Sequence, residues 1–157
     1  MDADQIEFRN ALGLFATGIT VITSMDGDTP MGLTANSFNS VSLDPPLVLW
    51  SMAKSSSMLS AYQKAPGFCI HVLGSDQQEL SNRFAGRAED RFANLDWQKS
   101  QLGLPLISGC VAHFECRSEH QYEGGDHIIF VGRVESYAAD AARPVLGYHR
   151  GKYVEIP

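Results

Sequence analysis

The stretch GLTANSFNSVSLDPP, residues 32–46, begins within one run that is typical of a β-strand, residues 31–38. It ends at the start of the next such run, residues 46–52. It contains three serines, two asparagines, one threonine and two prolines. A plain hairpin connection needs only about two to five residues. The length and the polar composition therefore indicate a segment that holds a polar ligand against its backbone. The alternative is a loop rich in Asx and Ser turns, which the composition alone favours.

The segments on either side of this stretch are mainly strand-like. Apolar and β-branched runs predict strands over residues 18–24, 31–38, 46–52, 68–73, 110–120, 127–138 and 152–156. Apolar spacing predicts helices over residues 4–16, 55–65 and 75–85, with Ser75 as the cap of the last one. Residues 86–105 are polar and irregular, and we expect a loop there. Because strands outnumber helices and do not alternate with them, we expect an antiparallel β-barrel with a few short helices.

The composition is that of one globular domain, residues 1–157, with 44% hydrophobic residues and a net charge of −6. No cluster of basic residues is present, which argues against a nucleic-acid partner. No apolar run approaches the ~20 residues of a membrane helix, and the start lacks the features of a signal peptide. Cys69, Cys110 and Cys116 have no metal-type spacing. We expect them to be buried reduced thiols, and the protein to be cytoplasmic.

Several common catalytic motifs are missing from the sequence. No G-x-G-x-x-G follows a predicted strand, and the Gly-Lys pair at residues 151–152 lacks the spacing of a P-loop. The five histidines form no H-E-x-x-H pair, and no G-x-S-x-G elbow occurs. Rossmann-type, hydrolase and metalloenzyme functions are therefore unsupported.

Two polar clusters suit the two ends of a flavin nucleotide. Residues 34–37, TANS, combine small side chains with amide and hydroxyl groups that can bond the edge of a planar ring. Residues 54–57, KSSS, precede a predicted helix, where unpaired N–H groups, hydroxyls and a lysine can bind phosphate. A simple N-cap is the alternative for the second cluster, but it accounts for only one serine.

A third cluster, GGDH at residues 124–127, lies at a turn that opens a predicted strand. His127 at the mouth of a strand can donate a hydrogen bond to a ligand or lie beside a hydride donor. The alternative is a surface histidine that Asp126 orients, and the residues themselves do not decide between the two.

Taken in order, the motifs of this chain resemble the short-chain flavin reductase family, the reductase components of two-component flavin-dependent monooxygenases. The matching segments cover nearly the whole chain: FRNALGLFATGITVIT at 8–23, GLTANSFNSVSLDPPLVLWSM at 32–52, KSSS at 54–57, LSNRFAG at 80–86, DRF at 90–92, LGLPLISG at 102–109, GDHIIFVGRVE at 125–135 and YHRGKY at 148–153. The resemblance implies a mainly β, FMN-binding split β-barrel of Greek-key type that forms a homodimer. It also implies reduction of FMN or FAD by NADH or NADPH, with release of reduced flavin to a partner oxygenase.

The resemblance also implies roles for individual residues. The flavin ring would be approached by the backbone and side chains of Thr17, Gly18, Thr34, Ala35, Asn36 and Ser37. Its ribityl and phosphate part would be held by Ser51, Met52, Ala53, Lys54, Ser55, Ser56 and Ser57. Phe84 and Ala85 would cover the flavin, with Arg91 nearby. His127 would lie where nicotinamide docks, and Tyr148, Arg150 and Tyr153 would complete that pocket.

Two positions depart from the family pattern: His71 stands where asparagine is usual, and Gly147 where a larger apolar residue is common. Two other functions stay open at this point. One is a flavoenzyme of the same fold that keeps its flavin and reduces ferric iron or a corrin. The other is a flavin-binding module without enzymatic activity, against which the GDH motif argues. Of the two nicotinamides we favour NADH, because no arginine cluster for a 2′-phosphate is evident.

Overall fold

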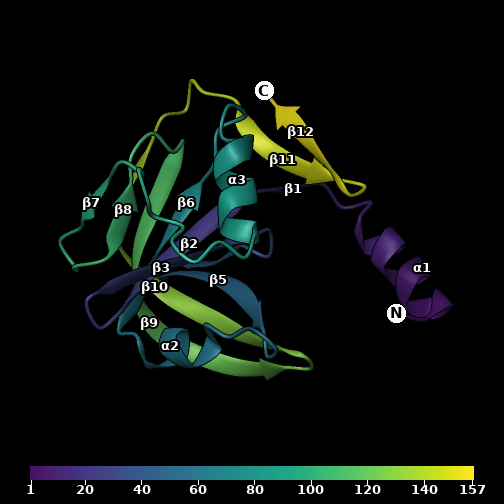
Figure 1. The fold of residues 1–157 in the computed structure, drawn as a ribbon, viewed down its shortest axis with the longest axis horizontal. Helices are drawn as coiled ribbons and strands as arrows, with labels where there is room; N and C mark the ends of the chain where they lie inside the picture. The colour runs from purple at the N-terminus through teal and green to yellow at the C-terminus, as the bar shows by residue number, and fades with distance from the viewer.

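The computed structural model describes residues 1–157 as an assembly of antiparallel strands with three helices (Figure 1). The helices are α1 (Ala3–Leu12), α2 (Leu59–Lys64) and α3 (Gln78–Ala85). The strands are β1 (Thr17–Gly18), β2 (Thr20–Asp26), β3 (Thr29–Ala35), β4 (Asn39–Leu43), β5 (Pro46–Ala53), β6 (Gly67–Val72), β7 (Trp97–Lys99), β8 (Pro105–Ile107), β9 (Ala112–Gly124), β10 (His127–Ala139), β11 (Val145–His149) and β12 (Lys152–Ile156).

Seven strands form one sheet in the order β3-β2-β6-β9-β10-β5-β4, and every neighbouring pair in it is antiparallel. A second sheet has the order β1-β11-β12, and β7 pairs with β8. The large sheet is not closed, because β3 and β4 are its two edges. The mainly β architecture predicted from the sequence is therefore confirmed, and the open edges are those of a split barrel.

The main core lies behind β5, where alternate residues point inward as the strand pleat requires. Val48, Trp50 and Met52 are buried, and the residues between them are only half-buried or exposed. Trp50 stacks on Phe130 of β10 at 4.6 Å between ring centroids. A second core joins α3 to β2 and β11 around Phe84. Each fully buried aromatic or aliphatic side chain contributes about 1.5–3 kcal/mol, so these two clusters hold the sheets together.

His71 on β6 is fully buried, and both nitrogens of its imidazole nevertheless have hydrogen-bond partners. Nδ1 lies 3.0 Å from the carbonyl oxygen of Val21, to which it donates, and Nε2 accepts from the Ile107 backbone N–H at 3.0 Å. The ring thus ties β6 to β2 and β8. Burial lowers the pKa of His71 from 6.5 to about 4, so the imidazole is neutral at physiological pH.

The structure corrects several of the predicted boundaries. The first helix ends at Leu12 with Gly13 as its C-cap, not at residue 16. The second begins at Leu59 rather than 55, and the cap of the third is Gln77 rather than Ser75. The polar stretch at 32–46 contains β4, the expected loop at 86–105 contains β7, and β8 and β11 were not predicted. These strands escaped prediction because they are short and show no regular apolar alternation.

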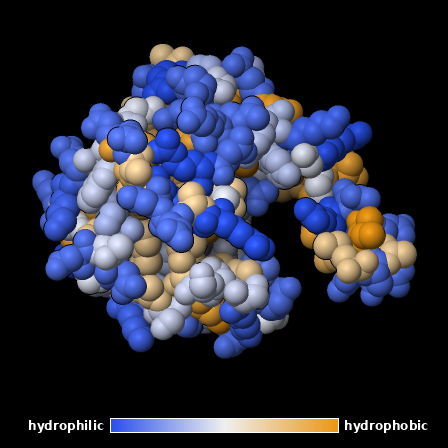
Figure 2. All heavy atoms as spheres, viewed as in Figure 1, coloured by the Kyte–Doolittle hydropathy of each residue, from blue (hydrophilic) through white to orange (hydrophobic).

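Helix α1 stands away from the rest of the molecule (Figure 1). None of its residues is buried, and the apolar side chains of Ile6, Phe8 and Leu12 are exposed. Figure 2 shows hydrophobic spheres on this helix and a hollow between it and the body. A helix this short gains most of its stability from packing, so an uncovered apolar helix predicts a partner surface. No helix of this structure has the length and apolar character needed to cross a membrane.

The three cysteines are free, with Cys69 and Cys116 fully buried and Cys110 partly buried. Burial raises the pKa of the Cys110 thiol to about 11 and that of Cys116 to about 12. Cys69 shifts in the same direction for the same reason. All three are therefore protonated and unreactive near neutral pH, which agrees with the expectation of buried thiols.

Candidate functional site

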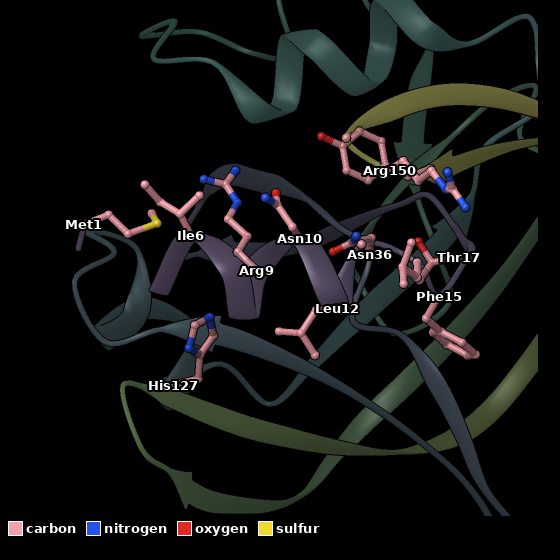
Figure 3. Close-up of a pocket in the computed structure, with 14 residues that line it drawn as sticks. Met1, Ile6, Arg9, Asn10, Leu12, Phe15, Thr17, Asn36, His127 and Arg150 are labelled. Atoms are coloured by element: carbon pink, nitrogen blue, oxygen red, sulfur yellow. The ribbon is translucent and has the colours of Figure 1, made fainter. Parts of the chain in front are cut away.

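Eight of the twenty predicted site residues line one of two cavities. The first, of about 920 Å³, lies between α1 and the body and is called the arm cavity (Figure 3). It is lined by Met1, Ile6, Arg9, Asn10, Leu12, Gly13, Leu14, Phe15, Thr17, Asn36, His127, Tyr148, Arg150 and Gly151. The second, of about 910 Å³, is called the loop cavity. It is lined by Thr29, Pro30, Met31, Gly32, Ser55, Ser57, Met58, Arg87, Ala88, Glu89, Asp90, Arg91, Phe92 and Trp97.

The arm cavity is electropositive. Arg9, His127 and Arg150 line it, and no carboxylate does, although the chain as a whole carries a net charge of −6. Neither Arg9 nor Arg150 forms an ion pair. The Arg150 backbone has a φ of 53° and its N–H donates to the Gly13 carbonyl at 2.8 Å, which fixes this turn beside the end of α1. The cavity is therefore suited to an anionic ligand.

His127 begins β10 at the rim of the arm cavity, opposite Ala53 of β5. Its Nδ1 lies 2.7 Å from Oδ1 of Asp126. The hydrogen bond from His127 lowers the pKa of the Asp126 carboxyl, which therefore stays ionised. With its Nδ1 proton donated to this carboxylate, the ring is oriented and its Nε2 remains available to a ligand.

Within the TANS stretch, three of the four residues are occupied by the fold itself. Thr34 Oγ1 donates to the Ser81 carbonyl of α3 at 2.6 Å, and Ala35 is buried. Ser37 Oγ accepts from the Ser51 N–H at 2.9 Å, which joins the end of β3 to β5. Asn36 is exposed and lines the arm cavity. Within the TANS stretch, the Asn36 amide is therefore the side-chain group that can reach a ligand in the arm cavity. The neighbouring residues can contact such a ligand through their backbone groups.

In the segment from Ser51 to Ser57, too, some residues pack or bond within the fold and others line a cavity. Met52 points into the core, and Ser56 Oγ accepts from the Met58 N–H at 3.3 Å. Met58 is the N-cap of α2 and makes no side-chain hydrogen bond, so Ser56 is the one serine whose hydroxyl bonds the backbone at the start of this helix. Ser55 and Ser57 instead line the loop cavity.

Lys54 is ion-paired with Glu123 near the tip of the β9–β10 hairpin. The side chains of both residues are exposed, at 42% and 75%. An exposed ion pair contributes little to stability, about 0–1 kcal/mol, so a ligand phosphate can compete with Glu123 for the ammonium group.

Phe84 and Arg91 hold the wall of the loop cavity. Phe84 is buried, and its ring lies against Gly32, where an added Cβ would come within 2.6 Å of the Phe84 ring. The Arg91 guanidinium donates to the carbonyls of Gly32 and Phe84, both at 2.8 Å, and to that of Gly86. Arg91 therefore fastens the loop after α3 to β3. Ala85 is exposed at the end of α3.

The β1-β11-β12 sheet supplies the remaining predicted residues. Thr17 pairs with Tyr148 and Gly18 with Gly147, so Thr17 and Tyr148 reach the arm cavity together. Tyr153 Oη instead contacts α3, at 2.8 Å from Ser81 Oγ and 2.9 Å from Asn82 Oδ1.

Gly147 faces the side chains of β12, not a cavity. A Cβ at this position would lie 2.7 Å from Ile156 Cδ1 and 2.9 Å from Val154 Cγ2. The glycine is therefore explained by packing against β12 rather than by a looser nicotinamide pocket.

Strand β3 connects the two cavities. Gly32 lines the loop cavity and Asn36 the arm cavity, and four residues of extended chain separate them by about 13 Å. The candidate group for these residues is a flavin mononucleotide, with its ring at Asn36 in the arm cavity and its phosphate at Ser55 and Ser57 in the loop cavity. The residues present fit this group, because exposed amide and hydroxyl groups and an electropositive cavity match a polar ring edge and an anionic tail.

Sequence reasoning missed Arg9 and Asn10 of the arm cavity, and Arg87 and Trp97 of the loop cavity. Only Arg9 carried a sequence signal, since it stands as a lone cation on an otherwise apolar and acidic helix.

A model of the flavin reductase like domain matches residues 12–157. The chain belongs to this flavin reductase family. Membership confirms the resemblance inferred from the ordered motifs.

Named relatives of this flavin reductase come from several bacteria. It is 55% identical to the FMN reductase (NADH) SmoA of Agrobacterium fabrum over 129 aligned residues. The alignment covers 81% of this chain and 72% of SmoA. It is 40% identical to HsaB of Rhodococcus jostii, a flavin-dependent monooxygenase reductase subunit, over 98% of this chain and 78% of that protein. The structure superposes with a TM-score of 0.93 on an NADH:FAD oxidoreductase of Streptomyces globisporus determined with NAD and FAD fragments. That pair is 40% identical and covers 98% and 93% of the two chains.

Proposed function

We propose that this chain is an NAD(P)H-dependent flavin reductase that reduces FMN or FAD by hydride transfer and releases the product to a partner monooxygenase. The observation that carries the proposal is the electropositive arm cavity, in which Asn36 and His127 lie together. Relatives that are named NADH-dependent FMN or FAD reductases, and reductase subunits of monooxygenases, support it. The same names favour NADH as the donor.

The proposed chemistry requires two planar rings in contact, because bound flavin accepts a hydride at N5 from the nicotinamide C4. The protein supplies position and charge. The Asn36 amide bonds the edge of the flavin ring, and His127, oriented by Asp126, donates or accepts at the nicotinamide side. Arg9 and Arg150 attract the diphosphate of the dinucleotide into the arm cavity.

The phosphate end of the flavin is assigned to Lys54, Ser55 and Ser57. Two serine hydroxyls lie at the wall of the loop cavity, and the lysine is restrained only by an exposed ion pair. Such contacts are reversible, which suits a reductase that must release its flavin.

Replacement of His127 with alanine is expected to lower the rate of NADH oxidation at saturating flavin by about ten- to a hundredfold, which corresponds to the loss of one hydrogen bond of about 1.5–3 kcal/mol. Flavin affinity should be nearly unchanged, because the contacts proposed for the flavin come from other residues. The measurement is anaerobic NADH and NADPH oxidation with FMN, FAD and riboflavin, together with flavin binding by fluorescence quenching in the same buffer.

His120, which is exposed on β9 and lines neither cavity, provides a matched control. The His120→Ala variant should behave as the wild type. A His127→Ala variant that loses flavin affinity but keeps its turnover would show that His127 contacts the flavin and not the nicotinamide. Saturation of turnover by free flavin separates a flavin reductase from an enzyme that retains its flavin.

The proposal also includes a homodimer of single-domain chains, residues 1–157, in which α1 packs on a second copy. The support is the exposed apolar surface of α1, with Phe8 66% and Leu12 59% exposed. We place the protein in the cytoplasm, where free buried cysteines stay reduced.

Substitution of Phe8 with glutamate is expected to shift the protein from dimer to monomer in sedimentation velocity experiments. Its charge would have to be buried in the proposed interface, which costs several kcal/mol. Gln63→Glu adds the same charge on the exposed face of α2 and should leave the dimer intact. A wild-type protein that sediments as a monomer, or a Phe8→Glu variant that remains a dimer, contradicts the arrangement.

A further inference from the structure

Strands β7 and β8 form a hairpin, residues 97–107, that is separate from the large sheet. It lies at one side of the molecule, where β8 contacts β2 and β6 (Figure 1). The hairpin carries Trp97 into the wall of the loop cavity, and Phe92 packs edge-on against the indole at 5.5 Å between ring centroids. The position of the hairpin on the sheet therefore determines how closed the cavity is at this wall.

Two buried side chains of the large sheet bond the backbone of β8. Thr23 Oγ1 of β2 donates to the Pro105 carbonyl at 2.5 Å. His71 Nε2 of β6 accepts from the Ile107 N–H at 3.0 Å. Both side chains are fully buried. Ile107 pairs with Trp97 across the hairpin, so the bond between His71 and Ile107 fixes the hairpin at the residue that lines the cavity.

Glu115 of β9 holds the turn of the same hairpin. It is 5% exposed, and no lysine or arginine forms an ion pair with it. Oε1 accepts from the Leu102 N–H at 2.7 Å and from the Ser100 hydroxyl, and Oε2 accepts from the Ser136 hydroxyl of β10 at 2.9 Å. Burial raises the pKa of this carboxyl, but the three donors outweigh burial and lower the pKa below its usual value. A buried carboxylate needs such bonds, so the charge and the ordered turn depend on each other.

We propose that Thr23, His71 and Glu115 are positioning residues of the flavin site. They hold the hairpin on the sheet so that Trp97 closes the loop cavity, which receives the flavin phosphate. With these anchors in place, FMN binds without first ordering the wall of its site. If the hairpin detaches, only the molecules that keep it attached bind FMN, and the apparent affinity falls in proportion. This inference rests on the proposed function, since it places the flavin phosphate in the loop cavity.

The first test replaces the anchors one at a time. Thr23→Val keeps the shape of the side chain and removes the donor, and Glu115→Ala removes the acceptor of the turn. Each should weaken FMN about tenfold in fluorescence titrations, the effect expected when about a tenth of the molecules keep the hairpin attached. Riboflavin has no phosphate to enter the loop cavity, so its affinity should be unchanged.

Two control variants separate positioning from a general loss of stability. Ser24→Ala removes a buried hydroxyl that donates to the Gly67 carbonyl at 2.6 Å within the large sheet, and it should change neither affinity. Glu115→Gln keeps an oxygen that can accept from Leu102 and Ser100, and it should bind FMN as the wild type does. CD and urea denaturation verify that each variant is folded under the conditions of the titration.

A second readout follows Trp97 without any flavin. The chain has two tryptophans, and the other, Trp50, is fully buried in the main core. Detachment of the hairpin should therefore shift the tryptophan emission to longer wavelength and increase its quenching by acrylamide. We expect both changes in Thr23→Val and Glu115→Ala, and neither in the two control variants.

The outcomes separate this inference from the proposed function. Unchanged tryptophan emission or unchanged FMN affinity in both anchor variants would overturn the positioning role alone. Equal losses for FMN and riboflavin would also overturn it, because they would show that the anchors act through the fold as a whole. A wild type that binds FMN and riboflavin equally would instead overturn the phosphate assignment of the proposed function, and the positioning role with it.

Discussion

Replacement of Arg91 with lysine is expected to lower the free energy of unfolding by about 3–5 kcal/mol, nearly as much as replacement with alanine. The guanidinium donates to three carbonyls on β3, on α3 and at the end of α3. Hydrogen bonds from a charged donor contribute about 1.5–3 kcal/mol each, and a lysine ammonium lacks the planar fork that reaches all three.

Urea denaturation of the wild type and of the Arg91→Lys and Arg91→Ala variants measures this effect. Arg83→Lys is the matched control, because Arg83 pairs loosely with Glu79 at 3.8 Å, donates to one carbonyl only, that of Ala93, and should lose much less stability than Arg91. A stable Arg91→Lys variant would show that the charge of Arg91 matters and its geometry does not. In that case we would assign Arg91 to ligand binding in the loop cavity rather than to the stability of the fold.

Acidification is expected to destabilise the wild type by about 3 kcal/mol more than a His71→Asn variant. The pKa of His71 is about 4 in the folded protein against 6.5 when unfolded. Below pH 6.5 the unfolded state therefore binds a proton that the folded state does not, and stability falls until the pH reaches about 4. The interval between these pKa values corresponds to about 3 kcal/mol.

The measurement is the difference in unfolding free energy between wild type and His71→Asn from pH 7.5 down to pH 4. Subtraction cancels the groups that both proteins share, including His113, which faces His71 across the β6–β9 pairing. The difference should shrink steadily below pH 6.5. A constant difference would mean that water reaches the imidazole and that His71 titrates normally. NMR titration of the His71 ring protons provides an independent value.

The β architecture was predictable because its central strands carry strong patterns. Residues 18–24 are β-branched, and the inward side of β5 alternates through Val48, Trp50 and Met52. The missed strands β4 and β11 lack such patterns, and tertiary pairing with β5 and with β1 and β12 forms them. Local propensity could not reveal that pairing, because β-strand formation depends on the partner strands, and one partner of β11, strand β1, lies far away in the chain.

The site could be predicted by region but not by side chain. Asn36 and His127 lie at a cavity, but Thr34 and Ser37 use the same kinds of polar group to bond the backbone of α3 and β5. Composition cannot distinguish a hydroxyl that binds a ligand from one that satisfies a carbonyl. Arg87 and Trp97 were missed because a loop without periodicity gives no indication of which residues face inward.

Strand β4 forms one edge of the seven-stranded sheet, and its irregular pairing has a consequence for solubility. The register shifts between Ser40 and Ser42, so Val41 bulges from the ladder and interrupts the row of free N–H and C=O groups. Leu43 is 95% exposed at the end of this edge, directly before Asp44 and two prolines. Bulges, charges and prolines prevent an apolar edge from adding strands of other molecules. The edge is thus protected against amyloid-like aggregation through its own backbone and side chains.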